Sequence, residues 1–474
     1  MGDPTGFIKV KRKEGGYRPL YERTLDFGEV EQTLNNDDRK LQASRCMDCG
    51  IPFCHWACPV GSVIPEWQDA LYRGEMKEAY KILHGTNSFP EITGRICPAP
   101  CEKSCVLAID NESVTIRENE CATVENAFSL GFVLPRIPVH RTNKKIAIIG
   151  SGPSGLSAAD LLNQLGHIVT VYEKNEEVGG LLRFGIPDFK LNKTIIDRRL
   201  EIFKKEGIIF KPNINVGVDI LAKDLINSFD AVILATGAEQ PRDLNVEGRN
   251  LKGINFAMEF LTQSNRRVSG KIIAKDKEIN AKNKHVVIIG GGDTGSDCVG
   301  TSVRQKATSI TQIEILPKPP EKRTTDNPWP YWPQILRTSS SHLEGCKRKW
   351  SLLTKGFIGK NGHVTGVKVV DVNWEKDING KWKMIEVGEE TIIPADLVLI
   401  AMGFTNPVKE GLLNDLGVAY KKNGTLKVDN KLQTNITGIF ATGDAVKGAG
   451  LVVHAIQSGR EVAEMVHGYL SKTS

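Results

Sequence analysis

Four cysteines lie within thirteen residues near the start of the chain, in the stretch "CMDCGIPFCHWACP" (46–59). Three more follow before position 106, so seven of the ten cysteines fall in the first quarter of the 474 residues. Because 40% of the residues are hydrophobic, a chain of this length can form its cores without disulfide support. Cysteines clustered in this way are typical of metal ligands or redox groups.

The spacing of these thiols bears on which metal centre they bind, since zinc and iron–sulfur clusters both use thiolate ligands. Structural zinc sites usually contain two C-x-x-C pairs, and here only Cys46 and Cys49 form such a pair. The later separations of five, four, four and four residues favour iron–sulfur chemistry, with zinc as the alternative. The other clustered thiols are Cys54, Cys58, Cys97, Cys101 and Cys105. We expect the distant Cys298 and Cys346 to be packing residues, because they form no C-x-x-C dithiol.

The stretch "IAIIGSGPSGLSAADLLNQLGHIVTVYE" (146–173) has the pattern of an apolar strand, a glycine-rich turn, an amphipathic helix and a second apolar strand. Gly150 permits the tight turn, Gly152 lets the backbone approach a pyrophosphate, and Gly155 lets helix and strand pack closely. The helix N-terminus offers free N–H groups to the phosphates. Glu173 ends the second strand, where its carboxylate can accept hydrogen bonds from a ribose. The combination predicts a dinucleotide site.

A second copy of this pattern begins with "HVVIIGGGDTG" (285–295) and indicates a second dinucleotide site. Its turn contains three glycines in the same spacing, Gly290, Gly292 and Gly295. We expect Glu314 inside the second strand, which leaves the position of a ribose-binding acid near Ile315 or Leu316. Three basic residues follow, Lys318, Lys322 and Arg323. An acid favours NADH and an arginine favours NADPH, so the sequence leaves the coenzyme open.

Each copy is later closed by a short apolar strand, at 230–238 and at 396–404. The duplication predicts an α/β protein with two Rossmann-like dinucleotide-binding domains and parallel sheets. A mostly α-helical N-terminal domain carries the cysteines, with a helical pattern at 64–83 that is expected to end before the turn "HGTNSFP". We expect the second and fourth of four segments to form one domain together. The segments are 1–140, 141–245, 246–404 and 405–474.

Near the C-terminus, "GIFATGDAVKGAG" (438–450) predicts a short strand followed by Gly443, Asp444 and a helix. Asp444 could be a helix-capping residue alone, but beside two dinucleotide folds a second contact to a flavin is the more informative interpretation. Two dinucleotides bound side by side suit hydride transfer from a nicotinamide to a flavin. A reduced flavin then needs an acceptor of single electrons, and clusters in the N-terminal domain would be that acceptor.

Charge and hydropathy argue against several other classes of protein. The formal net charge is only +6, from 62 basic and 56 acidic residues, and the basic residues form no stripe with interleaved aromatics. We therefore expect no nucleic-acid partner. No stretch approaches the roughly 20 apolar residues of a membrane span, and the first residues lack the apolar region of a signal peptide. We expect no membrane association and a cytoplasmic location.

The chain resembles, over essentially its whole length, the small (beta) subunit of NAD(P)H-dependent glutamate synthase. The stretches that carry the resemblance include "MGDPTGF", "RCMDCGIPFCHWACPVGSVIPEW", "TNSFPEITGRICPAPCEKSCVLAI", "VGGLLRFGIPDFKL", "GGGDTGSDCVGTSVRQ" and "DNPWPYWPQILR". The cysteine framework and the glycine turns are shared with dihydropyrimidine dehydrogenase and with the large subunit of a bifurcating NADH-dependent ferredoxin:NADP oxidoreductase. "MGDPTGF" and "DNPWPYWP" distinguish the glutamate synthase resemblance from these wider relatives.

This resemblance implies FAD on the first glycine turn, NADPH or NADH on the second, and two [4Fe–4S] clusters in the N-terminal domain. It adds Gly180 and Arg183 to the FAD site, and Asp293 and Thr294 to the coenzyme site. One cluster would be held by Cys46, Cys49, Cys54 and Cys105. The other would be held by Cys58, Cys97, Cys101 and Glu120. Cys121 stays an alternative to Glu120, because a soft thiolate suits iron better than a carboxylate.

By the same resemblance, the chain is expected to be the electron-input subunit of glutamate synthase. It would oxidise NAD(P)H through FAD and pass electrons through the clusters to a large (alpha) subunit, which makes L-glutamate from L-glutamine and 2-oxoglutarate. No residue of the chain is expected to act as a nucleophile or a general acid–base. The alternatives are the bifurcating oxidoreductase subunit and, in a different class, a non-catalytic scaffold with zinc in its cysteine-rich domain.

Overall fold

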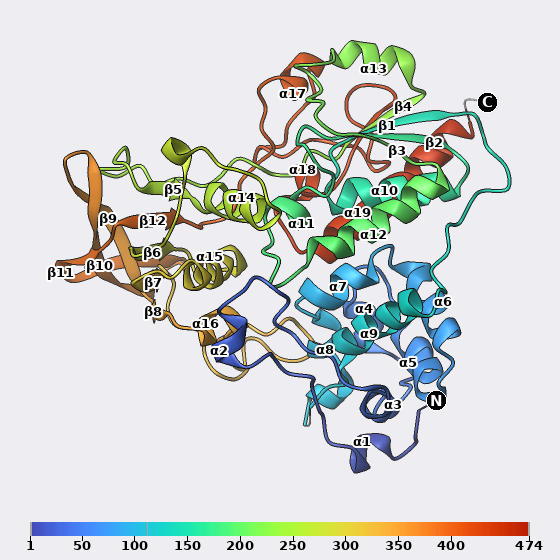
Figure 1. Ribbon diagram of the computed structural model, residues 1–474, viewed down its shortest axis with the longest axis horizontal. Helices are drawn as coiled ribbons and strands as arrows, with labels where there is room; N and C mark the ends of the chain where they lie inside the picture. The colour runs from blue at the N-terminus through green and yellow to red at the C-terminus, as the bar shows by residue number, and fades with distance from the viewer. Residues whose placement is uncertain (1, 111, 473–474) are drawn as a thin grey trace.

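The N-terminal region is built of short helices joined by loops. The computed structural model describes residues 2–110 and 112–472, and in Figure 1 this region lies below the first of two parallel sheets. Its α-helices are α1 (Gly6–Lys9), α2 (Leu20–Arg23), α3 (Asn36–Ser44), α4 (Phe53–Ala57), α5 (Ile64–Arg73), α6 (Met76–Thr86), α7 (Pro90–Ile96), α8 (Pro100–Lys103) and α9 (Ile116–Ser129). A 3₁₀ turn, η1 (Val106–Ala108), follows α8.

Helices α5 and α6 occupy the segment with the predicted helical pattern. Gly74 separates them, because its left-handed backbone (φ 78°) ends α5. The expectation that the helical pattern ends before His84 is wrong, since α6 continues to Thr86. His84 is buried and lies against the guanidinium groups of Arg136 and Arg199, so contacts from distant segments extend the helix.

The first parallel sheet has the strand order β13-β4-β1-β2-β3. Its strands are β1 (Lys145–Ile149), β2 (Ile168–Tyr172), β3 (Ile209–Lys211), β4 (Ala231–Leu234) and β13 (Ile439–Ala441). At its centre, Ile148 pairs with Val171 on one side and Ile233 on the other. The associated helices are α10 (Pro153–Gln164), α11 (Leu181–Phe184), α12 (Lys193–Glu206), α13 (Ala222–Ser228), α17 (Leu412–Leu416), α18 (Asp444–Lys447) and α19 (Val452–Leu470). Because β13 comes from the C-terminal segment, the chain completes this sheet after leaving the second one.

The second parallel sheet, at the left of Figure 1, has the order β5-β12-β6-β7-β8. Its strands are β5 (Ile254–Phe256), β6 (His285–Ile289), β7 (Ser309–Ile313), β8 (Lys347–Lys349) and β12 (Leu397–Ile400). The neighbouring helices are α14 (Ala257–Val268), α15 (Asp293–Arg304) and α16 (Ser340–Leu343), with the 3₁₀ turn η2 (Lys275–Lys277). The α/β class with two Rossmann-like sheets is confirmed. The four segment boundaries stay predictions.

An antiparallel sheet, in the order β11-β10-β9, extends from the second nucleotide fold. Its strands are β9 (Leu352–Lys360), β10 (His363–Lys376) and β11 (Trp382–Pro394). The sequence analysis did not predict this sheet. Val367 and Val369 of β10 are buried in one core with Val287 and Val398 of the parallel sheet, so it covers one face of the second fold.

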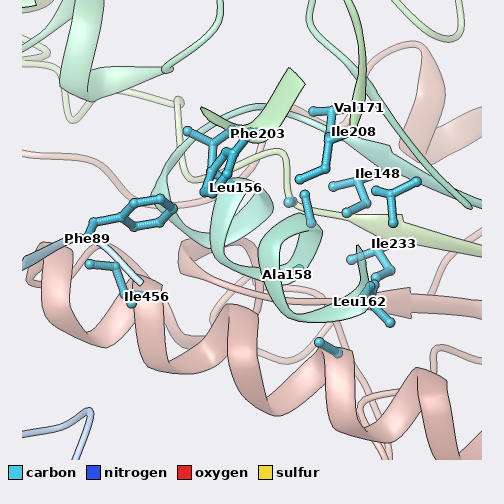
Figure 2. Close-up of a cluster of buried hydrophobic side chains, with 14 of the residues drawn as sticks. Phe89, Ile148, Leu156, Ala158, Leu162, Val171, Phe203, Ile208, Ile233 and Ile456 are labelled. Atoms are coloured by element: carbon cyan, nitrogen blue, oxygen red, sulfur yellow. The ribbon is translucent and has the colours of Figure 1, made fainter. Parts of the chain in front are cut away.

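One hydrophobic core joins the helical domain to the first nucleotide fold. Figure 2 shows Phe89 of the N-terminal domain beside Phe203 of α12 and Ile456 of α19. The rings of Phe89 and Phe203 meet edge to face, with 5.8 Å between their centroids. Ile92 belongs to the same core, which also contains Leu156 of α10. A close-packed shared core fixes the cysteine region relative to the first glycine turn.

A loop of the second nucleotide fold also contacts the N-terminal domain. The hydroxyl of Ser104 donates to the carbonyl of Pro330 over 2.7 Å, and the indole N–H of Trp329 donates to the carbonyl of Cys105 over 3.3 Å. The proline- and tryptophan-rich segment therefore packs on the cysteine domain. Across the described part of the chain, no helix is long and apolar enough to cross a membrane.

Candidate functional site

Four thiols from separate parts of the N-terminal domain line one cavity. They are Cys46, Cys49, Cys54 and Cys105. The first two lie in the loop after α3, the third lies in α4, and the fourth directly precedes η1. Most of the remaining wall is apolar, with Ile64, Val114 and Ile116 among its residues. These four thiols are the first ligand set that the family resemblance implies.

A second cavity is lined by three thiols and one carboxylate. They are Cys58, Cys97, Cys101 and Glu120. Val453, near the start of α19, also lines this cavity, which therefore lies where the helical domain meets the first nucleotide fold. Within the described residues, no three His, Cys, Asp or Glu side chains are grouped as ligands of a single metal ion. The donors instead line two separate cavities, four to each, which is the number of ligands that a [4Fe–4S] cluster takes.

The carboxylate of Glu120 is held by two polar side chains that the sequence analysis missed. Its Oε1 atom accepts hydrogen bonds from Asn87 Nδ2 over 2.9 Å and from Thr93 Oγ1 over 2.5 Å. Burial raises the pKa of Glu120 to about 7, although both hydrogen bonds oppose this shift. Asn87 lies in a loop and Thr93 on α7, so no local motif connects either residue with α9.

Cys121 follows Glu120 on α9 but packs in a different direction. A Cβ atom at Gly94 would lie 2.7 Å from both the Cα and the Cβ of Cys121, so this thiol-bearing residue abuts the backbone of α7. Among the described residues that line the second cavity, Glu120 is present and Cys121 is not. This placement favours Glu120 as the fourth donor.

Burial keeps these thiols protonated unless a metal ion replaces their protons. It raises the pKa of Cys46 and Cys97 to about 12 and that of Cys58 to about 11. It also raises the pKa of Cys101 well above the usual value for a thiol. Since the thiolate is the form that binds metal, filling either cavity with iron would release protons. Such buried thiols are poor free nucleophiles, which argues against dithiol chemistry.

The first glycine turn is shaped by close backbone contacts. A Cβ at Gly150 (φ 105°) would lie 2.3 Å from the carbonyl oxygen of Ala235. Gly152 has open space around the corresponding position, which leaves room for a phosphate. Glu173 follows β2 directly, and its Oε2 atom accepts hydrogen bonds from the hydroxyl (2.5 Å) and the amide (3.2 Å) of Ser151. The turn and the acid therefore lie together at the carboxyl edge of the sheet.

Gly180 and Gly443, which the sequence analysis also assigns to the flavin site, both lie against the first glycine turn. A Cβ at Gly180 (φ 53°) would lie 2.8 Å from the Cα of Gly152, so Gly180 adjoins the turn. A Cβ at Gly443 would lie 2.9 Å from the Ser154 side chain at the start of α10. Burial raises the pKa of Asp444, the next residue, to about 6.

Arg183 is taken up by ion pairs within its own fold. Its Nε donates a hydrogen bond to the carbonyl of Val178 over 2.7 Å. Its guanidinium also forms ion pairs with Glu177 over 2.8 Å and with Asp197. It therefore holds together the segment that carries Gly180. Its own contact with a flavin stays a prediction.

The second glycine turn repeats this geometry. A Cβ at Gly290 (φ 123°) would lie 2.3 Å from the carbonyl oxygen of Ala401, and one at Gly295 would lie 2.4 Å from that of Gly290. Gly292 is the N-cap of α15, with Asp293 and Thr294 in its first turn. The expectation that Glu314 lies inside a strand is wrong, because β7 ends at Ile313. Glu314 is the acid at the strand end.

Comparisons with known proteins agree with this arrangement. Residues 144–459 match the pyridine nucleotide-disulphide oxidoreductase family, and residues 23–130 match dihydropyrimidine dehydrogenase domain II, 4Fe-4S cluster. A glutamate synthase [NADPH] small chain of Mycobacterium tuberculosis is 46% identical over all of this chain and 97% of that protein. The glutamate synthase [NADH] of Schizosaccharomyces pombe is 42% identical over 97% of this chain and 22% of its own length.

A solved structure shares the fold of the two nucleotide domains. It is Mycobacterium tuberculosis FprA in complex with NADPH, with a TM-score of 0.56 over 70% of this chain and 85% of that one. At 18% sequence identity, this likeness supports the fold alone.

Proposed function

The chain belongs to the glutamate synthase small-chain family, and we propose that it takes electrons from NAD(P)H and delivers them to a large subunit that makes L-glutamate from L-glutamine and 2-oxoglutarate. The observation that carries this proposal is the combination, in one chain, of two glycine turns and two thiol-lined cavities. The second cavity lies where the helical domain meets the first nucleotide fold. The full-length likeness to glutamate synthase small chains disfavours the bifurcating alternative.

The residues of the chain support a division of labour between the two nucleotide folds. When bound, FAD would supply hydride uptake with release of single electrons, and [4Fe–4S] clusters would supply one-electron carriage. The first fold would hold FAD through Gly150, Gly152, Gly155 and Glu173. The second would bind NAD(P)H along Gly290, Gly292, Gly295 and the start of α15. Relatives named for NADPH and for NADH both match the chain, so family membership does not select the coenzyme.

We propose two [4Fe–4S] clusters, one in each thiol-lined cavity. The first would be held by Cys46, Cys49, Cys54 and Cys105. The second would be held by Cys58, Cys97, Cys101 and Glu120. The donor sets support this assignment, because each cavity is lined by four side chains that can ligate iron.

The experiment that tests this function uses the chain expressed in the cytoplasm of a host cell and purified without oxygen, with its cofactors bound. We expect flavin absorption bands with a broad iron–sulfur shoulder, both bleaching when NAD(P)H is added. The chain alone should reduce artificial acceptors and make no glutamate, and glutamate formation should require the large subunit. Absence of iron and labile sulfide from the purified chain would contradict the proposal.

Replacing Glu120 with alanine should remove roughly half of the bound iron, whereas the matched change Cys121→Ala should leave the iron content unchanged. The physical reason is placement, since Glu120 lines the second cavity and Cys121 packs against Gly94. Iron and labile-sulfide analysis of both variants measures the difference. Loss of iron from the Cys121 variant alone would make the thiol the ligand.

A further inference from the structure

Glu314 and Glu173 occupy equivalent places in the two nucleotide folds. Each follows the second strand of its βαβ unit directly, after β7 and β2 respectively. Glu314 Oε2 accepts a hydrogen bond from the amide of Gly291 over 2.6 Å, just as Glu173 Oε2 accepts one from the amide of Ser151 over 3.2 Å. Gly291 and Ser151 each come directly after the first glycine of their turn. The carboxylate of Glu314 therefore lies beside the second glycine turn, at the carboxyl edge of the sheet.

A carboxylate at this position distinguishes the two nicotinamide coenzymes. The 2′-hydroxyl of NADH can donate a hydrogen bond to it, whereas the 2′-phosphate of NADPH would meet it as a like charge. We propose that Glu314 makes the second nucleotide site select NADH over NADPH. This inference rests on the proposed function, because it concerns which NAD(P)H the same site accepts.

The nearby basic side chains make contacts other than an ion pair with Glu314. Among the residues that the structure describes, no lysine or arginine forms an ion pair with it. Arg323 is bound to the N-terminal domain, where its Nη2 donates to the carbonyl of Lys103 over 3.0 Å, and its Nη1 donates to the carbonyl of Tyr331 over 2.7 Å. It is therefore unavailable for the paired hydrogen bonds that an arginine makes to a 2′-phosphate.

Two other cations lie over the ring of Trp350, which follows β8 beside the end of β7, and neither forms an ion pair with Glu314 among the described residues. Arg348 stacks on this ring at 4.9 Å from its centroid and donates to the carbonyl of Arg337 over 3.1 Å. Lys318 Nζ lies 5.9 Å from the same centroid. A lysine can attract a phosphate as a point charge, but it lacks the planar fork of an arginine. The charged side chain that bonds the glycine turn directly is the carboxylate of Glu314.

The test compares the two coenzymes on the purified flavin- and iron-containing chain. Stopped-flow reduction without oxygen gives kcat/KM for NADH and for NADPH. Calorimetry with ADP-ribose and 2′-phospho-ADP-ribose measures binding without any electron transfer. We expect NADH and ADP-ribose to be favoured by at least about tenfold, the effect of one hydrogen bond to a charged group.

The variant Glu314→Gln removes the charge while its amide oxygen can still accept from Gly291, and it loses the weaker bond that Glu314 Oε1 accepts from the amide of Leu316 over 3.1 Å. We expect it to lower the preference about tenfold, mainly through tighter binding of 2′-phospho-ADP-ribose. The control Glu321→Gln removes the same charge from an exposed position in the following loop and should leave the preference unchanged. An unchanged preference in Glu314→Gln would give Glu314 a purely structural role and overturn the inference.

The outcomes also separate this inference from the proposed function. Equal or faster reduction by NADPH in the unmodified chain would overturn the inference while leaving the function intact. Failure of both coenzymes to reduce the flavin would contradict the function itself.

Discussion

Replacing Cys54 with serine is expected to abolish electron delivery to the large subunit while leaving the reduction of FAD by NAD(P)H intact. Cys54 lines the first cavity, which is formed within the N-terminal domain and apart from both glycine turns. Replacing a residue that only hydrogen-bonds a metal ligand often lowers metal affinity by about 10–100-fold, so loss of a ligand itself should have a larger effect. We expect roughly half of the iron to be lost, with glutamate formation reduced by at least about a hundredfold.

The measurement pairs iron analysis with two rates from the same preparation, anaerobic flavin bleaching and glutamate formation with the large subunit. Cys346→Ser is the matched control, since Cys346 is remote from both cavities in sequence and lines neither of them. A Cys54→Ser protein that keeps its full iron content would show that this thiol is not a ligand. If iron is lost but glutamate formation persists, the first cavity lies outside the electron route.

Most of what the sequence predicted depends on local chemistry. The first glycine turn needs its residue types because a Cβ atom at Gly155 would lie 2.1 Å from the carbonyl oxygen of Gly150, and that contact follows from the strand–turn–helix pattern itself. The two parallel sheets follow from the duplicated pattern. The two ligand sets came from a resemblance, and the structure adds that each set lines one cavity.

The misses depend on contacts between distant segments. The sequence analysis placed Glu314 inside a strand because apolar residues follow it in "SITQIEIL". The pairing of β7 with β6 nevertheless stops at Ile313. The antiparallel sheet at 352–394 was missed because β11 is largely exposed and lacks a clear apolar alternation. Glu120 and Cys121 are neighbours about 100° apart on a helix, so only the packing of Gly94 against Cys121 shows which one faces the cavity.

The shared core gives the arrangement its functional consequence. The second cavity meets α19 at Val453, and Gly459 of the same helix packs against Ser154 at the start of α10. One helix thus contacts both the thiol-lined cavity and the first glycine turn. Because closely packed helices are rigid relative to one another, the docking of the N-terminal domain fixes the distance between the second cavity and the first glycine turn.

This docking includes a buried ion pair whose disruption should have the largest effect on stability. Arg199 of α12 binds Glu91 of α7 through both oxygens, with Nε to Oε1 at 2.6 Å and Nη2 to Oε2 at 3.0 Å. Both side chains are at most 3% exposed. Glu91→Ala would leave the guanidinium buried without its partner, which typically costs about 3–5 kcal/mol. We expect a lower denaturant midpoint and faster proteolysis between the helical domain and the first nucleotide fold.

Two further variants test whether the missing partner, and not the lost charge, causes the effect. Glu201→Gln removes a carboxylate from the exposed side of the same α12, where it pairs with Lys204, and should leave the midpoint unchanged. The double variant Glu91→Leu/Arg199→Leu replaces the pair with apolar side chains and should recover part of the stability lost in Glu91→Ala. A double variant no more stable than Glu91→Ala would show that the buried, unpaired guanidinium does not cause the loss of stability.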